Sequence, residues 1–97
     1  MPTTKQYSIY VIKSLKDHQN YTGLSSNVEK RIKMHNDGKV KSTKSRRPFQ
    51  LIYYEFIGSL PEARLREKYY KSSTGRKNLE RIISERIKHL GGSLPDC

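Results

Sequence analysis

The sequence predicts an α+β fold of the broad α/β class, with three helices flanking a three-stranded antiparallel sheet in the order β-β-α-β-α-α. Two strand-like runs are joined by a short polar loop, and two S-x-x-E patterns mark the starts of helices. The chain has 97 residues, 33% of them hydrophobic, which suits one modest core. We therefore expect a single domain over residues 1–97, with its core at about 7–90.

The first two strands are expected to form a hairpin. Residues 7–13 are rich in β-branched and aromatic side chains, which is typical of a strand. The polar residues 14–19 predict the loop, and residues 20–24 predict the second strand. If these strands pair, their alternation places Tyr10 and Tyr21 on one face of the sheet, and Gly23 shares the face of Tyr21.

A helix and a basic loop follow the hairpin. Ser26 to Glu29 form a capping-box pattern that opens the first helix, and the run Asn36-Asp37-Gly38 ends it at about Asn36. Residues 39–48 form a basic loop with serine and threonine side chains and no apolar periodicity. The third strand, residues 49–57, is apolar on both faces, so we expect both faces to be covered.

Two helices complete the predicted fold. Ser59 to Glu62 form the second capping box, with proline in the first turn, where its missing N–H costs little. That helix is expected to end at about Lys71, and residues 72–75 to separate it from a last helix over about 76–89. Gly91 and Gly92 are expected to end the chain's last helix, whose apolar stripe consists of Leu79, Ile82, Ile83, Ile87 and Leu90.

The charge of the chain indicates a polyanionic partner. Twenty lysines and arginines against nine acidic residues give a formal net charge of +11, which favours phosphate-backbone contacts. An anionic membrane would suit the same charge, but the sequence has no apolar run long enough for a span and no signal-peptide core. We expect a nucleic acid, DNA or RNA, as the partner, and no membrane.

Cysteine and histidine usage indicates a reducing compartment without structural zinc. The single cysteine, Cys97, has no internal disulfide partner, which suits the cytoplasm. No Cys/His pair has zinc-ligand spacing, and His18 and His89 are expected to be solvated. No pattern predicts an oligomeric state.

Ionisable side chains occupy core-facing positions in two predicted helices. One face of the first helix holds Val28, Arg31, Ile32 and His35. A similar stripe on the second helix holds Leu60, Ala63, Glu67 and Tyr70, and the competing apolar side holds Leu65 and Tyr69. A buried charge must be paired, bind a metal or lie in a wet cleft. Helix periodicity alone leaves an internal Arg31–Glu67 ion pair and a functional site equally open.

The two tyrosines favour the functional site. Tyr10 and Tyr21 are expected to project toward the helices that carry Arg31 and Glu67. Phosphodiester chemistry needs a hard-cation ligand, a proton acceptor for water, and positive donors for the charge on phosphate. Tyrosines on a sheet more often serve packing, so it is the whole set that predicts such chemistry.

In this order and spacing, the motifs resemble the GIY-YIG nuclease domain. The matching pattern runs from about Tyr7 to Leu90 and comprises Ser8-Ile9-Tyr10, Tyr21-Thr22-Gly23, Arg31 and Glu67. Ser8 replaces the first glycine of the family name, and Thr22 replaces the isoleucine of its second half. Residues 29–36, 38–49 and 63–68 are similar to small stand-alone bacterial members. The resemblance implies a metal-dependent endonuclease that hydrolyses DNA by direct attack of water, structure-directed, in DNA repair or processing.

The resemblance also implies a role for each site residue. Tyr10 matches the tyrosine that contacts the attacking water and acts as its general base, and Tyr21 the one that positions phosphate or water. Arg31 matches the arginine that stabilises the pentacovalent phosphate. His35 lies where relatives carry histidine, a position implied to bind phosphate or assist proton transfer. Gly23 matches the glycine that lets backbone and substrate approach.

The resemblance makes Glu67 the single carboxylate that holds a divalent metal, Mg²⁺ or Mn²⁺. Such a site is chemically reasonable because magnesium keeps several waters and takes few protein ligands. Tyrosine has an ordinary pKa of about 10, so it needs nearby cations before it takes a proton at neutral pH. A later asparagine of the family corresponds only loosely to Asn78, whose role stays open.

The basic loop is expected to supply affinity, with a merely solvated loop as the alternative. Ser42 and Thr43 are candidate hydrogen-bond donors to phosphates, and the candidate cations are Lys39, Lys41, Lys44, Arg46 and Arg47. No base-reading module is recognisable. Two other functions suit part of the pattern: a non-catalytic nucleic-acid-binding module that keeps the nuclease fold, and a ribosome-associated structural protein. The complete set of site residues favours the nuclease.

Overall fold

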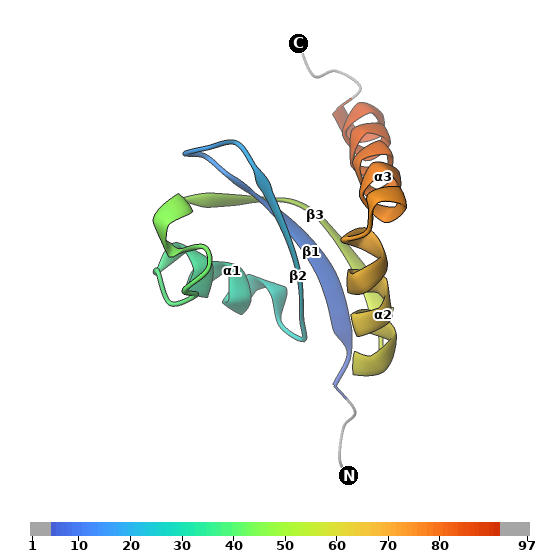
Figure 1. Ribbon diagram of the computed structural model, residues 1–97, viewed down its shortest axis with the longest axis horizontal. Coiled ribbons are helices and arrows are strands. Elements are labelled where there is room, and N and C mark those ends of the chain that lie inside the picture. Colours follow the sequence, from blue (N-terminus) through green and yellow to red (C-terminus); the bar gives the residue numbers. More distant parts are fainter. Residues whose placement is uncertain (1–4, 92–97) are drawn as a thin grey trace.

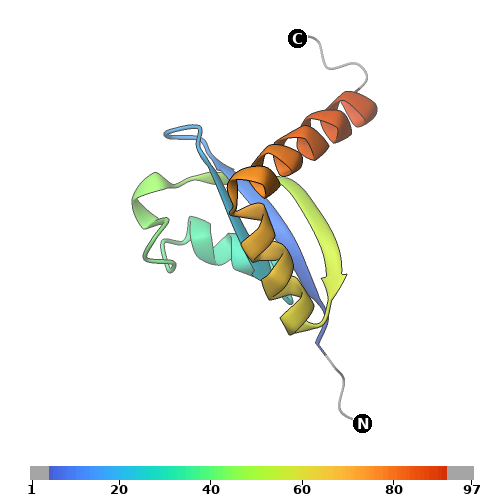
Figure 2. The ribbon, with the colours of Figure 1, turned by 45° about the vertical axis from the view of Figure 1, so that its right-hand side comes forward.

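A computed structural model describes the backbone of residues 5–91 and the side chains of residues 5–86. Its elements are β1 (Tyr7–Ser14), β2 (Asn20–Ser25), α1 (Val28–Asn36), the 3-10 helix η1 (Lys44–Arg46), β3 (Phe49–Gly58), α2 (Leu60–Tyr70) and α3 (Ser73–Gly91). The antiparallel sheet has the strand order β2-β1-β3. Helix α1 lies on one face, and α2 and α3 lie on the other (Figures 1 and 2). The predicted fold class is confirmed.

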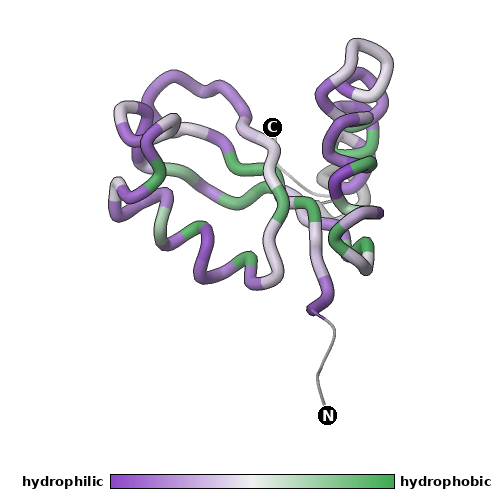
Figure 3. The backbone as a smooth tube through the Cα atoms, turned by 60° about the horizontal axis from the view of Figure 1, so that its bottom comes forward, coloured by the Kyte–Doolittle hydropathy of each residue, from purple (hydrophilic) through white to green (hydrophobic). Residues whose placement is uncertain are grey.

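The central strand β1 contributes to two cores because its alternate side chains enter opposite faces of the sheet. Ile9 and Val11 pack with Tyr53 under α2 and α3. Tyr10 and Ile12 pack with Phe49, and Val28 and Ile32 of α1 cover them. The hydrophobic stretches therefore concentrate along the strands, while much of the surrounding chain is hydrophilic (Figure 3).

The two predicted capping boxes have different outcomes. At α1 the N-cap is Asn27, whose side-chain oxygen accepts the Lys30 N–H at 3.1 Å, so the box expected from Ser26 is wrong. An asparagine at this position competes directly for the role, because its side-chain carbonyl reaches the first free N–H groups of the helix. At α2 the box is confirmed: Ser59 and Glu62 each accept the other's backbone N–H.

Strand β3 differs from the expectation that both its faces are covered. It is an edge strand, and the side chains of Tyr54 and Phe56 are 59% and 63% exposed. Helix α1 has 9 residues and is about 14 Å long, whereas the 10 residues of β3 extend over about 33 Å. The helix covers Phe49 at the start of β3 and is too short to cover the rest.

Helix α3 begins three residues earlier than predicted. The Ser72 hydroxyl accepts the Gly75 N–H at 3.1 Å, and the Ser72 carbonyl accepts the Arg76 N–H at 2.8 Å. Serine therefore caps this helix, and the break after α2 is narrower than residues 72–75. The inner stripe is confirmed for Leu79, Ile82 and Ile83, which pack onto the sheet. The side chains of Ile87, His89 and Leu90, together with Gly92 and Cys97, lie outside the described residues.

Candidate active site

Three buried polar side chains form the floor of the candidate site. The Tyr10 hydroxyl oxygen lies 2.8 Å from His35 Nε2, and His35 Nδ1 lies 2.7 Å from Thr43 Oγ1. Tyr10 is 1% exposed, and His35 and Thr43 are fully buried. The structure thus joins two predicted site residues directly and adds Thr43, which was expected only as a donor to phosphates.

Burial determines the protonation states of His35 and Tyr10. It lowers the pKa of His35 to about 4, with a further contribution from the positive charge of Arg31, so the imidazole is neutral at pH 7. Burial also raises the pKa of Tyr10, and the neighbouring Arg31 guanidinium offsets only part of that effect. A tyrosine that acts as a base near neutral pH needs the opposite shift. In the free protein, Tyr10 is a protonated hydroxyl.

Tyr21 and Gly23 of β2 lie above Tyr10 on the same face, as expected from the strand alternation. The Tyr21 ring centroid lies 5.1 Å from that of His35 and 6.4 Å from that of Tyr10. Gly23 pairs with Tyr10, and a Cβ at position 23 would fall 2.6 Å from the Tyr10 hydroxyl oxygen. The glycine therefore leaves room for the tyrosine, while its contact with substrate stays a prediction.

Glu67 approaches the site from a helix on the opposite face. The expectation that the helix of Glu67 lies on the face of Tyr10 is wrong, because α2 packs against the Ile9 and Val11 side of the sheet. The Glu67 carboxylate nevertheless acts electrostatically on Tyr10, raising its pKa. Among the described residues, Glu67 forms no ion pair with Arg31, so the internal-pair alternative is wrong.

The ion-pair partner of Glu67 is Lys71, one helical turn later. Its Nζ lies 3.3 Å from a Glu67 carboxylate oxygen and 5.7 Å from the centroid of the Tyr21 ring. The i,i+4 spacing from Glu67 is the sequence signal that identifies this residue. Lys71 therefore connects Glu67 of α2 with the Tyr21 ring.

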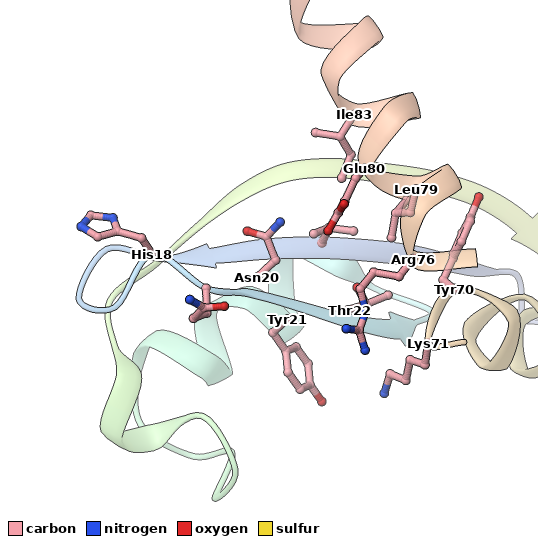
Figure 4. Close-up of a pocket in the computed structure, with 12 residues that line it drawn as sticks. His18, Asn20, Tyr21, Thr22, Tyr70, Lys71, Arg76, Leu79, Glu80 and Ile83 are labelled. Carbon is pink, nitrogen blue, oxygen red and sulfur yellow. The ribbon is translucent and has the colours of Figure 1, made fainter. Parts of the chain in front are cut away.

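A cavity of about 530 Å³ lies between β2 and α3 beside the site. Lys71 and Arg76 belong to its lining, and the Lys71 side chain points to the same side of β2 as the Tyr21 ring (Figure 4). Two cations thus extend the site along the edge strand. Asn78 does not join them: its side-chain amide donates to the Tyr69 hydroxyl.

The carboxylate that lies beside the tyrosines is Glu67, and Glu80 lines the adjoining cavity. In residues 5–86, no group of three or more His, Cys, Asp or Glu side chains could hold an ion. A half-buried Glu67 still fits magnesium, which takes one or two carboxylates and completes its shell with water and substrate phosphate oxygens. The carboxylate already neutralises a cation, Lys71, in this structure.

The basic loop is anchored to the hairpin, and its cations fall into two groups. Ser14 donates to the Arg46 carbonyl at 2.7 Å, and the Leu15 N–H donates to the Pro48 carbonyl at 2.8 Å. The Arg46 side chain pairs with Asp17 at 2.9 Å, and Arg47 Nε donates to the Lys44 carbonyl at 2.8 Å. The group with exposed side chains and no such anchoring bond consists of Lys39, Lys41 and Lys44.

Comparison with known proteins assigns this chain to a family. Residues 6–80 match the family described as the GIY-YIG catalytic domain. A UPF0213 protein of Clostridium perfringens is 44% identical over 81 residues, covering 82% of this chain and 86% of the relative. The UPF0213 protein YazA of Bacillus subtilis is 43% identical over 84 residues, covering 86% and 83%. No solved structure matches. No helix in the described part of the chain has the length and apolarity of a membrane span.

Proposed function

Because this chain belongs to the GIY-YIG nuclease family, we propose that it is a metal-dependent endonuclease that hydrolyses DNA phosphodiester bonds. The observation that carries the proposal is the cluster on one face of the sheet. Tyr10 contacts His35 at 2.8 Å, and Tyr21 lies beside both rings. The Lys71–Glu67 pair adjoins Tyr21, so a carboxylate and a cation lie beside the two tyrosines.

Each residue has a role that its position supports. Arg31 and Lys71 offer positive charge to the phosphate, and Tyr21 positions it. Glu67 would hold the magnesium or manganese ion, which when bound supplies positive charge to the phosphate oxygens and lowers the pKa of a bound water. Tyr10 accepts a proton from the attacking water, whose oxygen bonds to phosphorus as the bond from phosphorus to the leaving oxygen breaks.

The cationic surface supports a nucleic-acid substrate bound through its backbone. Lys39, Lys41 and Lys44 are exposed in the basic loop, and Lys71 and Arg76 line the cavity beside β2. Contacts of this kind read shape rather than base sequence. We therefore propose DNA with a branch, nick or single-stranded region as substrate, in a cytoplasmic repair or processing step, with RNA as the alternative.

A non-catalytic nucleic-acid-binding module is the second candidate, and the burial of Tyr10 favours it. A tyrosine that is 1% exposed, with a raised pKa, is poorly suited to proton abstraction unless its environment changes. Such a module would bind the same DNA without cutting it.

A cleavage panel decides between the two candidates. Flaps, junctions, nicked duplex and single strands are incubated with Mg²⁺ or Mn²⁺, and wild type is compared with Glu67→Ala. The matched control is Glu85→Ala, which removes an exposed glutamate from another i,i+4 pair. The nuclease predicts cleavage that falls about a hundredfold or more in Glu67→Ala and is unchanged in the control. Undiminished cleavage by Glu67→Ala, or binding without cleavage under every divalent metal, would contradict it.

A further inference from the structure

The hydrogen bonds that join Tyr10, His35 and Thr43 can be arranged in two ways. Neutral His35 has one ring proton, so one nitrogen donates and the other accepts. Nε2 faces the Tyr10 hydroxyl and Nδ1 faces the Thr43 hydroxyl, and either hydroxyl can donate or accept. The proton of His35 therefore decides which way the Tyr10 hydroxyl points.

Thr43 has one further polar neighbour, which favours one of the two arrangements. Its Oγ1 lies 3.4 Å from the Val40 carbonyl oxygen, which can only accept. The Thr43 N–H also donates to that carbonyl at 3.1 Å, so the side chain is held over the turn. If the Thr43 proton goes to Val40, its oxygen must accept from His35 Nδ1–H. Nε2 then accepts from Tyr10.

We propose that Thr43 is a positioning residue, which holds His35 in its Nδ1–H tautomer and thereby turns the Tyr10 hydroxyl proton away from the substrate. The other groups that face the imidazole are Tyr21 from β2, Phe49 from β3 and Arg31 from α1. None of them offers Nδ1 a carbonyl or carboxylate in place of Thr43, so the tautomer depends on this one hydroxyl.

The tautomer determines what Tyr10 can do in the proposed nuclease, on which this inference rests. With Nε2 accepting, the lone pairs of the tyrosine oxygen face Arg31 and the substrate. The water's proton then passes to the Tyr10 oxygen while the tyrosine's own proton passes to Nε2, so His35 becomes an imidazolium instead of Tyr10 a tyrosinate. The negative charge of the phosphate offsets this positive charge until His35 returns the proton to solvent. In the opposite tautomer Nε2–H occupies a lone pair, and the hydroxyl proton points at the substrate. Tyr10 would then be a hydrogen-bond donor.

This exchange of protons also explains how Tyr10 can accept a proton although its pKa is raised. A buried tyrosine need not ionise if it exchanges one proton for another within a hydrogen-bonded chain. The far end of that chain lies in the basic loop, between Lys41 and Lys44, and the loop is fixed to the hairpin through Ser14 and Arg46. The segment that is expected to bind DNA therefore also carries the hydroxyl that orients the catalytic tyrosine.

Nuclear magnetic resonance of the imidazole nitrogens in ¹⁵N-labelled protein tests the inference without any cleavage. The wild type is expected to carry the His35 proton on Nδ1, and Thr43→Ser to keep it there. Thr43→Val, which keeps the shape and loses the hydroxyl, is expected to gain Nε2–H. A proton on Nε2 in the wild type, or an unchanged tautomer in Thr43→Val, would overturn the inference and leave the nuclease proposal intact.

Kinetics supply the second measurement. Thr43→Val is expected to lower kcat at least about tenfold with KM unchanged, while Thr43→Ser stays close to wild type. Ser84→Ala, which removes an exposed hydroxyl from α3, is the control and should change neither. Equal kcat values for wild type and Thr43→Val would also overturn the inference. If Thr43→Val does not fold, the wild-type tautomer and the serine variant still decide.

Discussion

Gly23 lies directly opposite Tyr10 in the β1–β2 pairing, in a space that any larger side chain would take from the tyrosine. A Cβ there would fall 2.6 Å from the Tyr10 hydroxyl oxygen and 2.7 Å from Cζ, which is closer than unbonded atoms pack. The position of the Tyr10 ring therefore requires glycine at position 23, because a side chain there would occupy the same space.

Gly23→Ala is expected to displace the Tyr10 ring and break its bond to His35. Overpacking of this kind costs about 1–3 kcal/mol in unfolding free energy, and the proposed cleavage should fall by about tenfold or more. Urea denaturation and cleavage rates measure the two effects. Thr22→Ser, on the neighbouring residue of β2, is the control. An alanine variant with wild-type activity would show that the Tyr10 position is not critical.

Acid is expected to destabilise the protein through His35. Its pKa is about 4 in the folded protein against 6.5 in the unfolded chain, so between these values the unfolded chain binds more protons. Stability is therefore complete above about pH 6.5 and falls as the pH drops toward 4, by about 3 kcal/mol in total. Urea denaturation at about pH 7 and about pH 4.5 measures the loss. His35→Gln should lose less stability over the same interval, and an equal loss would assign the effect to other groups.

Lys71→Met is expected to bind manganese more tightly than the wild type. The lysine neutralises Glu67, the carboxylate proposed to hold the metal, so a metal must compete with it. Because partly exposed ion pairs contribute up to about 1 kcal/mol, the Kd should fall about two- to fivefold. Titration calorimetry with Mn²⁺ measures it. Lys33→Met removes the equivalent lysine from the Lys33–Asp37 pair and should leave the Kd unchanged. Weaker binding by Lys71→Met would mean that Lys71 supports the metal site.

The basic loop should separate into residues that bind DNA and one that supports the fold. Lys41→Ala is expected to weaken DNA binding with no change in Tm, and to lower the salt dependence by about one counterion. Arg46→Ala should lower Tm, because it removes the Asp17 ion pair, a bond to the Gln19 carbonyl and the stacking on Phe49. Binding is measured with the Glu67→Ala background to prevent cleavage. If Lys41→Ala lowers Tm as much as Arg46→Ala, the proposed separation between DNA-binding and fold-supporting residues of the loop is wrong.

Helix periodicity predicted the inner face of α1 and left two candidate stripes on α2. Arg31 and His35 lie on the covered face of α1, and of the two stripes considered for α2 the one with Ala63 and Tyr70 is buried. Periodicity does not reveal which face of the sheet a helix covers, and for that reason the side of α2 was predicted wrongly. That choice depends on the crossing of whole elements in three dimensions.

Loop residues mark the limit of prediction from the sequence. Thr43 lies in a run of basic residues without a repeat, so nothing in its neighbourhood indicates a buried hydroxyl. Its burial follows from the anchoring of the loop by Ser14 and Arg46, which brings together parts of the chain 32 residues apart. Lys71 was more accessible to prediction, since its spacing from Glu67 is local.

The uncovered half of β3 has a consequence for the protein in concentrated solution. An edge strand offers unpaired backbone groups to a neighbouring chain, and here Tyr54 and Phe56 add adhesive apolar area. Mutual repulsion between molecules of net charge +11 opposes that contact. Salt at about 1 M shortens the range of this repulsion to about 3 Å, but it does not remove the exposed apolar area of Tyr54 and Phe56. The protein should therefore aggregate more readily as ionic strength rises. Proteins whose solubility increases with added salt behave in the opposite way.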